Sequence, residues 1–339
     1  MADWLIMALP LVLALGLSAA LTPVVKAVVV RLGLLDQPGE RRSHSMPTAR
    51  GGGVALVLAV VVTAFALAGM AVAAPVVGLL VALAAIGWLD DVSDLPVRWR
   101  LPGFFAVAAL MLWITGPVGA VAVGPLVLDW PWLWSALALI AVVWLINLHN
   151  FMDGADGLAA MQLAWSGVLF GLLLFDPQAP VPSTLAFSLA GAALGFLVWN
   201  RPQASIFMGD VGSVSAGGLV GFLALSGAAS GQVSIWVSLM ICSVFVVDAT
   251  ATLIRRARSG QRWYTAHREH AYQRLLVLGW SHGRVLGLYG LVNVAVVLPF
   301  VLAALSFPAW DFPLALCLIA LLFGAWYVVQ CRASKEHYA

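Results

Sequence analysis

The sequence predicts an all-α polytopic integral membrane protein with about eleven transmembrane helices. Of its 339 residues, 63% are hydrophobic and only 9% are charged, whereas a soluble domain carries roughly 25% charged residues. Its apolar runs reach the length of about 20 residues that crosses a hydrocarbon core of ~30 Å. Backbone groups in lipid must be satisfied within each segment, so the spans are helices and not strands.

Eleven apolar runs of 15–27 residues are predicted to be spans, and together they are expected to form a single transmembrane domain without an appended soluble domain. They cover residues 4–30, 51–70, 73–89, 102–116, 132–147, 158–175, 183–199, 212–229, 233–254, 285–303 and 311–330. The first run is expected to be a retained helix, because it is too long for the apolar region of a signal peptide and only Asp3 precedes it.

The basic residues predict the orientation. Alternating spans place 16 of the 17 Lys and Arg residues on one side, and Lys26 lies at the same face in the last turn of the first span. The positive-inside rule makes this side cytoplasmic. The N-terminus is then periplasmic and the C-terminus cytoplasmic. The cytoplasmic loops that would form the active face are 31–50, 90–101, 148–157, 200–211 and 255–284.

The third span ends in two adjacent carboxylates, Asp90 and Asp91, followed by Asp94. Asp91 and Asp94 stand three residues apart, a spacing that places them on one face of a helix. Carboxylates packed this closely at a membrane surface are costly without a cation or a basic partner. The alternative is a charged helix end that pairs with Arg98 and Arg100.

The stretch from Asn147 to Gly157 holds Asn150 and a second pair of carboxylates, Asp153 and Asp156, again three residues apart. Carboxylate and amide oxygens suit Mg²⁺, which takes one or two protein carboxylates together with water and phosphate oxygens. The alternative is a cluster of hydrogen bonds between helices.

A third polar stretch opens the eighth span with Phe207, Gly209, Asp210 and Gly212. Free N–H groups and the helix dipole favour an anion at such a terminus, although Asp210 could simply cap the helix. Phe207 could be an interfacial anchor or a platform on which a base stacks.

Two basic loops complete the set of polar segments. The first contains Arg41, Arg42 and His44 and runs into three glycines at 51–53, which indicates a close approach of the backbone. In the second, His267, Arg268 and His270 form a cluster that suits a diphosphate. The alternative for both loops is contact with anionic lipids at the membrane surface. Asp248, inside the ninth span, is either a functional carboxylate or the partner of a nearby arginine.

The joint occurrence of these segments on one membrane face is what indicates chemistry. Several carboxylates, an expected Mg²⁺ and two basic loops are typical of phosphoryl-type transfer, in which positioning and neutralisation of charge dominate. A site at the membrane surface implies that one substrate is a lipid.

The chain resembles the polyprenyl-phosphate N-acetylhexosamine-1-phosphate transferases, glycosyltransferase family 4, which include the phospho-MurNAc-pentapeptide translocase. The resemblance covers essentially the whole chain, with the motifs in family order. They are Asp36-x-Pro, Arg41-Arg42-x-His44 followed by glycines, Asp90-Asp91, Asn150-x-x-Asp153-Gly-x-Asp156-Gly, Phe207-Met-Gly-Asp210-x-Gly-Ser213 and the histidine-bearing loop. Prenyl-aromatic transferases fit less well, because they have no counterpart of the motif at 207–213.

The resemblance implies that undecaprenyl phosphate attacks the β-phosphorus of a UDP-N-acetylamino sugar, with Mg²⁺ (or Mn²⁺) as cofactor, and that UMP leaves. Asp210 would be the principal metal ligand, with Asp91 as a second. Asp90 and Asp91 would be catalytic and engage the lipid phosphate, one of them as a base. The phosphate monoester has a second pKa near 6, so the need for a base stays open. The substrate-binding residues would be Asn150, Asp153, Asp156, Phe207 (on uracil), Arg41, Arg42, His44, His267, Arg268 and His270.

The loop sequence His-Arg-Glu-His and the eleventh span resemble the branch that starts O-antigen with GlcNAc, FucNAc or QuiNAc, in the bacterial inner membrane. A translocase of the peptidoglycan type is the alternative within the family. A secondary transporter and a non-catalytic scaffold are the alternatives from other classes. The implied partners are undecaprenyl phosphate, the UDP-sugar and the lipid bilayer, without nucleic acid, and family members often form homodimers.

Overall fold

The computed structural model describes residues 3–37, 47–261 and 267–336. Within these residues nine helices are long and apolar enough to span a membrane, and two shorter apolar helices, α2 (Gly53–Ala68) and α6 (Leu158–Leu173), join them. These eleven segments match the eleven predicted spans in order, with shifts of a few residues at their ends. The prediction of an all-α polytopic membrane protein is confirmed.

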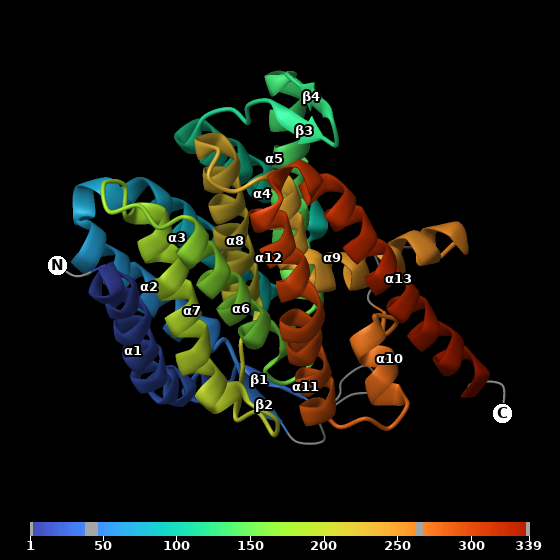
Figure 1. Cartoon of the computed structure of the whole chain (residues 1–339). Helices are drawn as coiled ribbons and strands as arrows, with labels where there is room; N and C mark the ends of the chain where they lie inside the picture. The colour runs from blue at the N-terminus through green and yellow to red at the C-terminus, as the bar shows by residue number, and fades with distance from the viewer. Residues whose placement is uncertain (1–2, 38–46, 262–266, 337–339) are drawn as a thin grey trace.

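The longer spans form the rest of the bundle (Figure 1). They are α1 (Asp3–Arg31), α3 (Met70–Ser93), α4 (Val97–Thr115), α5 (Pro131–Phe151), α7 (Val181–Asn200), α8 (Asp210–Ser230), α9 (Ile235–Arg258), the continuous run of α11 (His282–Val292), η1 (Asn293–Val297) and α12 (Leu298–Ser306), and α13 (Asp311–Glu336), which the 3₁₀ turn η2 (Pro308–Trp310) precedes.

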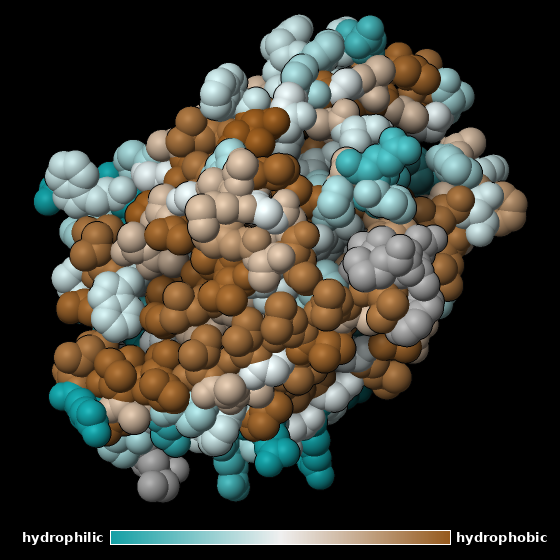
Figure 2. Space-filling view, turned by 90° about the vertical axis from the view of Figure 1, so that its left-hand side faces the viewer, coloured by the Kyte–Doolittle hydropathy of each residue, from teal (hydrophilic) through white to brown (hydrophobic). Residues whose placement is uncertain are grey.

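Hydrophobic side chains cover the outside of this bundle. Figure 2 shows a broad hydrophobic area on the side that carries α1, with hydrophilic residues gathered at its margins. Among the long spans α8 is the most buried, packed against α2, α3 and α5. The small residues of α8 allow this close packing. A Cβ on Gly217 would lie 2.9 Å from the carbonyl oxygen of Leu145, and such small residues let membrane helices approach closely.

The sequence did not predict three small features. Three short strands, β1 (Leu35–Asp36), β2 (Thr48–Arg50) and β5 (Ile206–Phe207), form a sheet in which β2 pairs antiparallel to β1 and parallel to β5. A hairpin of β3 (Val121–Val123) and β4 (Leu126–Leu128) lies at the opposite end of the bundle. The short helix α10 (Ala271–Val277) lies at the end that carries β1 and β2 (Figure 1). That end holds the candidate site.

Candidate active site

The N-terminus of α8 is fixed by the glycine run at 51–53. The N–H groups of Gly51 and Gly52 donate to the carbonyl of Phe207 at 3.2 and 2.9 Å, and Gly53 donates to Met208 at 2.8 Å. A Cβ on Gly53 would overlap Gly212 in the first turn of α8. The close backbone approach predicted from these glycines is therefore confirmed, and its partner is the segment that leads into α8.

Asp91 caps α8. Its two carboxylate oxygens accept the backbone N–H groups of Asp210 and Val211 at 2.9 and 3.0 Å, and its side chain is only 3% exposed. Gly209, at φ +73°, leaves room for this carboxylate, because a Cβ there would lie 2.7 Å from its Oδ2. A carboxylate at this terminus also interacts favourably with the helix dipole.

Asp91 and Asp94 do not share a face, so that prediction is wrong. The reason is that α3 ends at Ser93 and Asp94 adopts a left-handed conformation with φ 46°. Asp94 lies instead beside Asp90 at a small cavity, while Asp91 points to the start of α8.

Two arginines connect the carboxylates. Arg50 bonds Asp91 through Nε at 2.8 Å and Asp210 through Nη2 at 2.6 Å. Arg100 bonds Asp90, and its Nη1 lies 3.5 Å from the second oxygen of Asp210. Burial opposes the charge of Arg50, but Asp210 and Asp91 outweigh it and raise the pKa of the guanidinium. Three carboxylates and two guanidiniums leave the cluster one negative charge in excess, so it favours a further cation.

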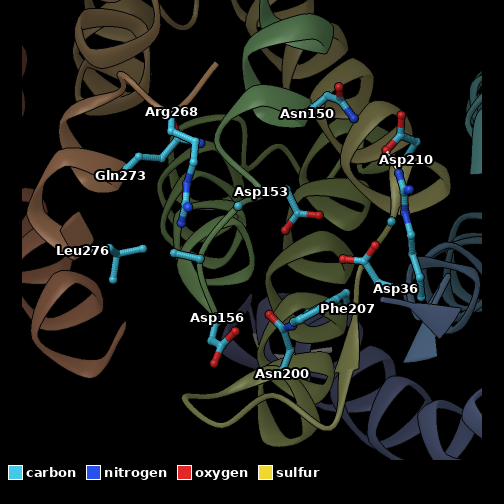
Figure 3. Close-up of a pocket in the computed structure, with 14 residues that line it drawn as sticks. Asp36, Asn150, Asp153, Asp156, Asn200, Phe207, Asp210, Arg268, Gln273 and Leu276 are labelled. Carbon is cyan, nitrogen blue, oxygen red and sulfur yellow. Dashed lines mark hydrogen bonds and ion pairs between the residues drawn. The ribbon is translucent and has the colours of Figure 1, made fainter. Parts of the chain in front are cut away.

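Two cavities meet at this cluster. The one lined by 14 residues, called the larger cavity for the length of its lining, is drawn in Figure 3. The other, lined by six residues and called the smaller cavity, lies between α3, the start of α4 and the start of α8. Arg50 and Asp210 line both. The other residues of the larger cavity are Asp36, Asn150, Asp153, Gly154, Ala155, Asp156, Asn200, Phe207, Gly209, Arg268, Gln273 and Leu276, and those of the smaller one are Asp90, Asp94, Leu95 and Arg100.

Asp153 and Asp156 lie in the loop between α5 and α6, within the predicted loop 148–157, and therefore do not share a helical face although their spacing is that of one. Both line the larger cavity, and Asp153 projects into it (Figure 3). Burial, followed by repulsion from Asp210, raises the pKa of Asp153 well above its usual range. Asp156 also holds the loop, because it accepts the N–H of Ala204 at 3.2 Å and lies 3.3 Å from Nδ1 of His282.

Two asparagines support the walls of the larger cavity. Asn150 donates to the hydroxyl of Ser213 at 3.2 Å and thereby ties the end of α5 to α8. Asn200 accepts the N–H of Gly157 at 3.0 Å and donates to the carbonyl of Ile206 at 2.9 Å. Phe207, which follows Ile206 in the chain, lines the same cavity, and its role as a platform for a base stays a prediction.

The predicted residues of the second basic loop differ in position: one lines the larger cavity, and the two histidines pack elsewhere. Arg268 lines the larger cavity, whereas His267 and His270 do not. His270 is 3% exposed and stacks on Tyr272 and Phe151. Burial, followed by the charge of the His270 ring and of nearby arginines, lowers the pKa of His267 to about 4. The role of these two histidines at phosphate stays a prediction.

The contacts of Glu269 and Asp248 give both residues structural roles. Glu269 pairs with Arg255, Arg256 and Arg274. Asp248 caps α10, accepting the N–H groups of Ala271 and Tyr272 at 2.6 and 3.3 Å, and it also accepts the hydroxyl of Tyr289 at 2.6 Å. Among the described residues no arginine pairs with Asp248. By capping α10, which contributes Gln273 and Leu276 to the larger cavity, Asp248 supports the wall that also carries Arg268.

Three predicted residues, Arg41, Arg42 and His44, lie outside the described residues. Two further contributors, Arg50 and Arg100, were not assigned to the site from the sequence. Their positions in the sequence could have indicated this. Arg50 directly precedes the glycine run, and Arg100 follows the Asp90-Asp91 pair across a short turn. Asn200, Gln273 and Leu276 gave no comparable signal.

The residues present fit a Mg²⁺ ion with few protein ligands. No group of three or more His, Cys, Asp or Glu side chains within the described residues could hold a metal by itself. Asp210, which belongs to the cluster with the excess negative charge, lines one cavity together with Asp153, and Mg²⁺ commonly binds through one or two carboxylates with substrate phosphates completing its shell. Both oxygens of Asp91 already accept backbone N–H groups, so Asp210 and Asp153 are the better placed donors.

Comparison with known proteins agrees with the motifs. The profile of glycosyl transferase family 4 matches residues 72–228, which run from α3 to α8. A decaprenyl-phosphate N-acetylglucosaminephosphotransferase of Mycobacterium tuberculosis is 32% identical over 315 residues, covering 80% of this chain and 77% of the relative. The chain belongs to glycosyl transferase family 4. The family resemblance drawn from the motifs is thereby confirmed.

Two further relatives are also named as transferases. A probable undecaprenyl-phosphate N-acetylglucosaminyl 1-phosphate transferase of Bacillus subtilis is 28% identical over 270 residues, covering 77% of this chain and 75% of the relative. A phospho-N-acetylmuramoyl-pentapeptide-transferase of Synechococcus is 34% identical over 241 residues, covering 64% and 68%. The profile match contains all the carboxylates of the two cavities except Asp36.

Proposed function

We propose that this family 4 protein transfers an N-acetylamino-sugar 1-phosphate from a UDP-sugar to undecaprenyl phosphate. UMP leaves, and undecaprenyl-diphospho-sugar remains as the first lipid-linked intermediate of a surface polysaccharide such as O-antigen. The observation that carries the proposal is that two cavities share one wall, made of Arg50 and Asp210. A transfer between two phosphorylated substrates needs such an arrangement, with both phosphates brought to one charged wall.

The larger cavity is the proposed site of the nucleotide-sugar. Phe207 offers a ring on which uracil can stack, and Arg268 supplies a cation for the diphosphate. The smaller cavity, next to Arg100, is the proposed site of the lipid phosphate. It lies at the start of α4, the predicted membrane surface, where a polyprenyl headgroup would enter.

In the proposed reaction an oxygen of the lipid phosphate bonds to the β-phosphorus, and the bond from that phosphorus to the bridging oxygen of UMP breaks. Arg50 lies between the two cavities and would neutralise charge on both sides of the reacting phosphorus. Asp210 and Asp153 would hold Mg²⁺, which supplies further neutralisation of phosphate charge when bound. Much of the lipid phosphate is already a dianion at neutral pH, since its second pKa is about 6.

This electrostatic arrangement gives Asp90 and Asp91 different proposed roles. Asp90 lines the lipid-side cavity and holds Arg100 there. Asp91 holds the start of α8, so its contribution to turnover is mainly through the position of Asp210. The names of the relatives in M. tuberculosis and B. subtilis favour GlcNAc as the sugar. The bacterial inner membrane, with the active site on its cytoplasmic face, is the proposed location.

The test is release of UMP by purified protein in detergent, with undecaprenyl phosphate, Mg²⁺ and a panel of UDP-sugars that includes UDP-MurNAc-pentapeptide. We expect release that needs both the lipid phosphate and Mg²⁺ and that is lost in Asp210→Asn. The best sugar in the panel identifies the branch. Folded protein that releases no UMP with any sugar would overturn the proposal, and full activity of Asp210→Asn would overturn the metal site.

A further inference from the structure

A groove of about 860 Å³ runs between α9 and α13. Figure 1 shows α13 as the last span of the bundle. None of its lining residues belongs to the two cavities of the active site. Its walls are mostly apolar and open to the outside of the bundle, since Ile254, Phe323 and Tyr327 are 47%, 48% and 58% exposed. Surfaces of this kind suit acyl chains, and α13 closes one side of the groove.

One end of the groove is positively charged. Arg255 and Arg258, in the last turn of α9, line it. Within the described residues Arg258 forms no ion pair, and the buried Nε of Arg255 has no hydrogen-bond partner. Residues 249–310 contain seven arginines but only one carboxylate, Glu269. That carboxylate is already shared among three arginines, so the groove offers uncompensated positive charge beside an apolar wall.

The two walls of the groove meet at the residue next to the active site. Arg255 of α9 pairs with the side chain of Glu269, and Gln330 of α13 donates to the backbone carbonyl of Glu269 at 2.8 Å. The preceding residue, Arg268, lines the catalytic cavity. An anion at Arg255 competes with Glu269 for this guanidinium and therefore acts on the position of Arg268.

We propose that the groove between α9 and α13 binds an anionic phospholipid, whose phosphate lies against Arg255 and Arg258 and whose acyl chains lie along the apolar walls. Basic pockets between spans on the cytoplasmic side bind such headgroups. The occupant is not the lipid substrate, because a phosphate held by these arginines is outside both catalytic cavities. We also infer that occupancy changes turnover through Glu269 and Arg268. This second inference rests on the proposed function.

The binding test uses purified full-length protein and an equimolar mixture of phosphatidylglycerol and phosphatidylcholine, with retained lipid measured by native mass spectrometry. We expect the wild type to retain phosphatidylglycerol in preference. Arg258→Gln should weaken that preference about fivefold, the effect of roughly one arginine near an anionic surface. Arg332→Gln is the matched control, because Arg332 is an exposed arginine on α13 that does not line the groove.

A second measurement reports on the groove directly. Cys331 lines it, whereas Cys317, on the same helix, is exposed and does not. Phosphatidylglycerol should slow modification of Cys331 by a membrane-permeant maleimide relative to Cys317, and phosphatidylcholine should not. Equal retention of the two phospholipids, or an unchanged preference in Arg258→Gln, would overturn the proposal. Protection of Cys331 by undecaprenyl phosphate alone would assign the groove to the substrate and also overturn it.

These binding measurements need no turnover, so they separate the groove from the transferase reaction. The regulatory inference is tested by UMP release in nanodiscs with and without phosphatidylglycerol. We expect a change in wild-type rate that Arg258→Gln reduces and Arg332→Gln keeps. Equal wild-type rates in the two membranes would overturn the regulatory inference.

Discussion

Replacing Asp91 with asparagine tests whether this carboxylate is first of all the cap of α8. In the wild type both of its oxygens accept backbone N–H groups, from Asp210 and Val211, and the carboxylate also pairs with Arg50. Asparagine keeps one acceptor oxygen, but it presents an NH₂ group to the second N–H and carries no charge. The change therefore leaves one buried donor without a partner and removes a negative charge from the helix terminus.

The magnitude follows from these contacts. A buried donor left unsatisfied costs about 1–3 kcal/mol, and the lost charge at the helix terminus costs about 0.3–1 kcal/mol. Arg50 keeps Asp210 as a partner and its side chain is 32% exposed, so the lost ion pair adds only about 0–1 kcal/mol. We expect a total of about 3 kcal/mol, which corresponds to a fall in Tm of about 4 °C for a chain of 339 residues, whose unfolding entropy is roughly 2.1 cal/mol/K per residue.

The loss of activity should follow from the same displacement. Asp210 is the first residue of α8, and a shift of about 1 Å in a reacting group can cost about a hundredfold in rate. The matched comparison is Asp90→Asn, because Asp90 accepts no backbone N–H in the described structure and pairs with Arg100 alone. We expect Asp90→Asn to lose activity with a clearly smaller fall in Tm than Asp91→Asn.

Thermal unfolding of ligand-free protein in mild detergent, followed by the fluorescence of the 15 tryptophans, measures both variants. UMP release measures their activity under the same conditions. If Asp91→Asn unfolds at the wild-type temperature, the capping role is refuted. If it does so while losing all activity, Asp91 acts directly in the reaction, as the family resemblance implied.

Three further predictions concern the larger cavity. Phe207→Leu should raise the KM for the UDP-sugar about tenfold and leave the KM for the lipid unchanged, because stacking on a base contributes about 1–3 kcal/mol; steady-state kinetics checks this, and equal effects on both substrates would contradict it. Gly209→Ala should lower Tm more than Gly231→Ala, since both glycines have a φ near +70° but only the first would place a Cβ against a carboxylate; equal losses in the two melting curves would mean that backbone strain alone decides. For Asp153, whose pKa burial raises, the unfolded carboxyl releases its proton near pH 4 while the folded one keeps it. The contribution of Asp153 to the stability of the ligand-free protein should then fall as the pH rises from about 4 through the raised pKa, and Asp153→Asn should reduce the fall seen in the wild type and raise Tm at pH 8. Melting curves from pH 5 to 8 test it, and a variant with the wild-type pH profile would disprove it.

The sequence contained enough to predict the bundle and the face of the site. Each span satisfies its own backbone hydrogen bonds and hydropathy, so its existence is a local property that eleven apolar runs reveal one by one. The arginines indicated equally well which ends of the spans share one side of the membrane. Their one-sided distribution appears as soon as the spans are counted correctly. The motifs at 90–91, 150–157 and 207–213 also indicated which loops had to meet, and the structure brings residues of all three to the two cavities that share Arg50 and Asp210.

The role of each carboxylate became clear only from the tertiary structure. Spacing of three residues was read as a shared helical face, but α3 ends before Asp94, and Asp153 and Asp156 lie in a loop. The contact between Arg50 and Asp210 joins residues 160 positions apart. Whether a carboxylate caps a helix, pairs with an arginine or faces a cavity depends on how the packed helices bring such distant residues together, and no local pattern encodes that distance.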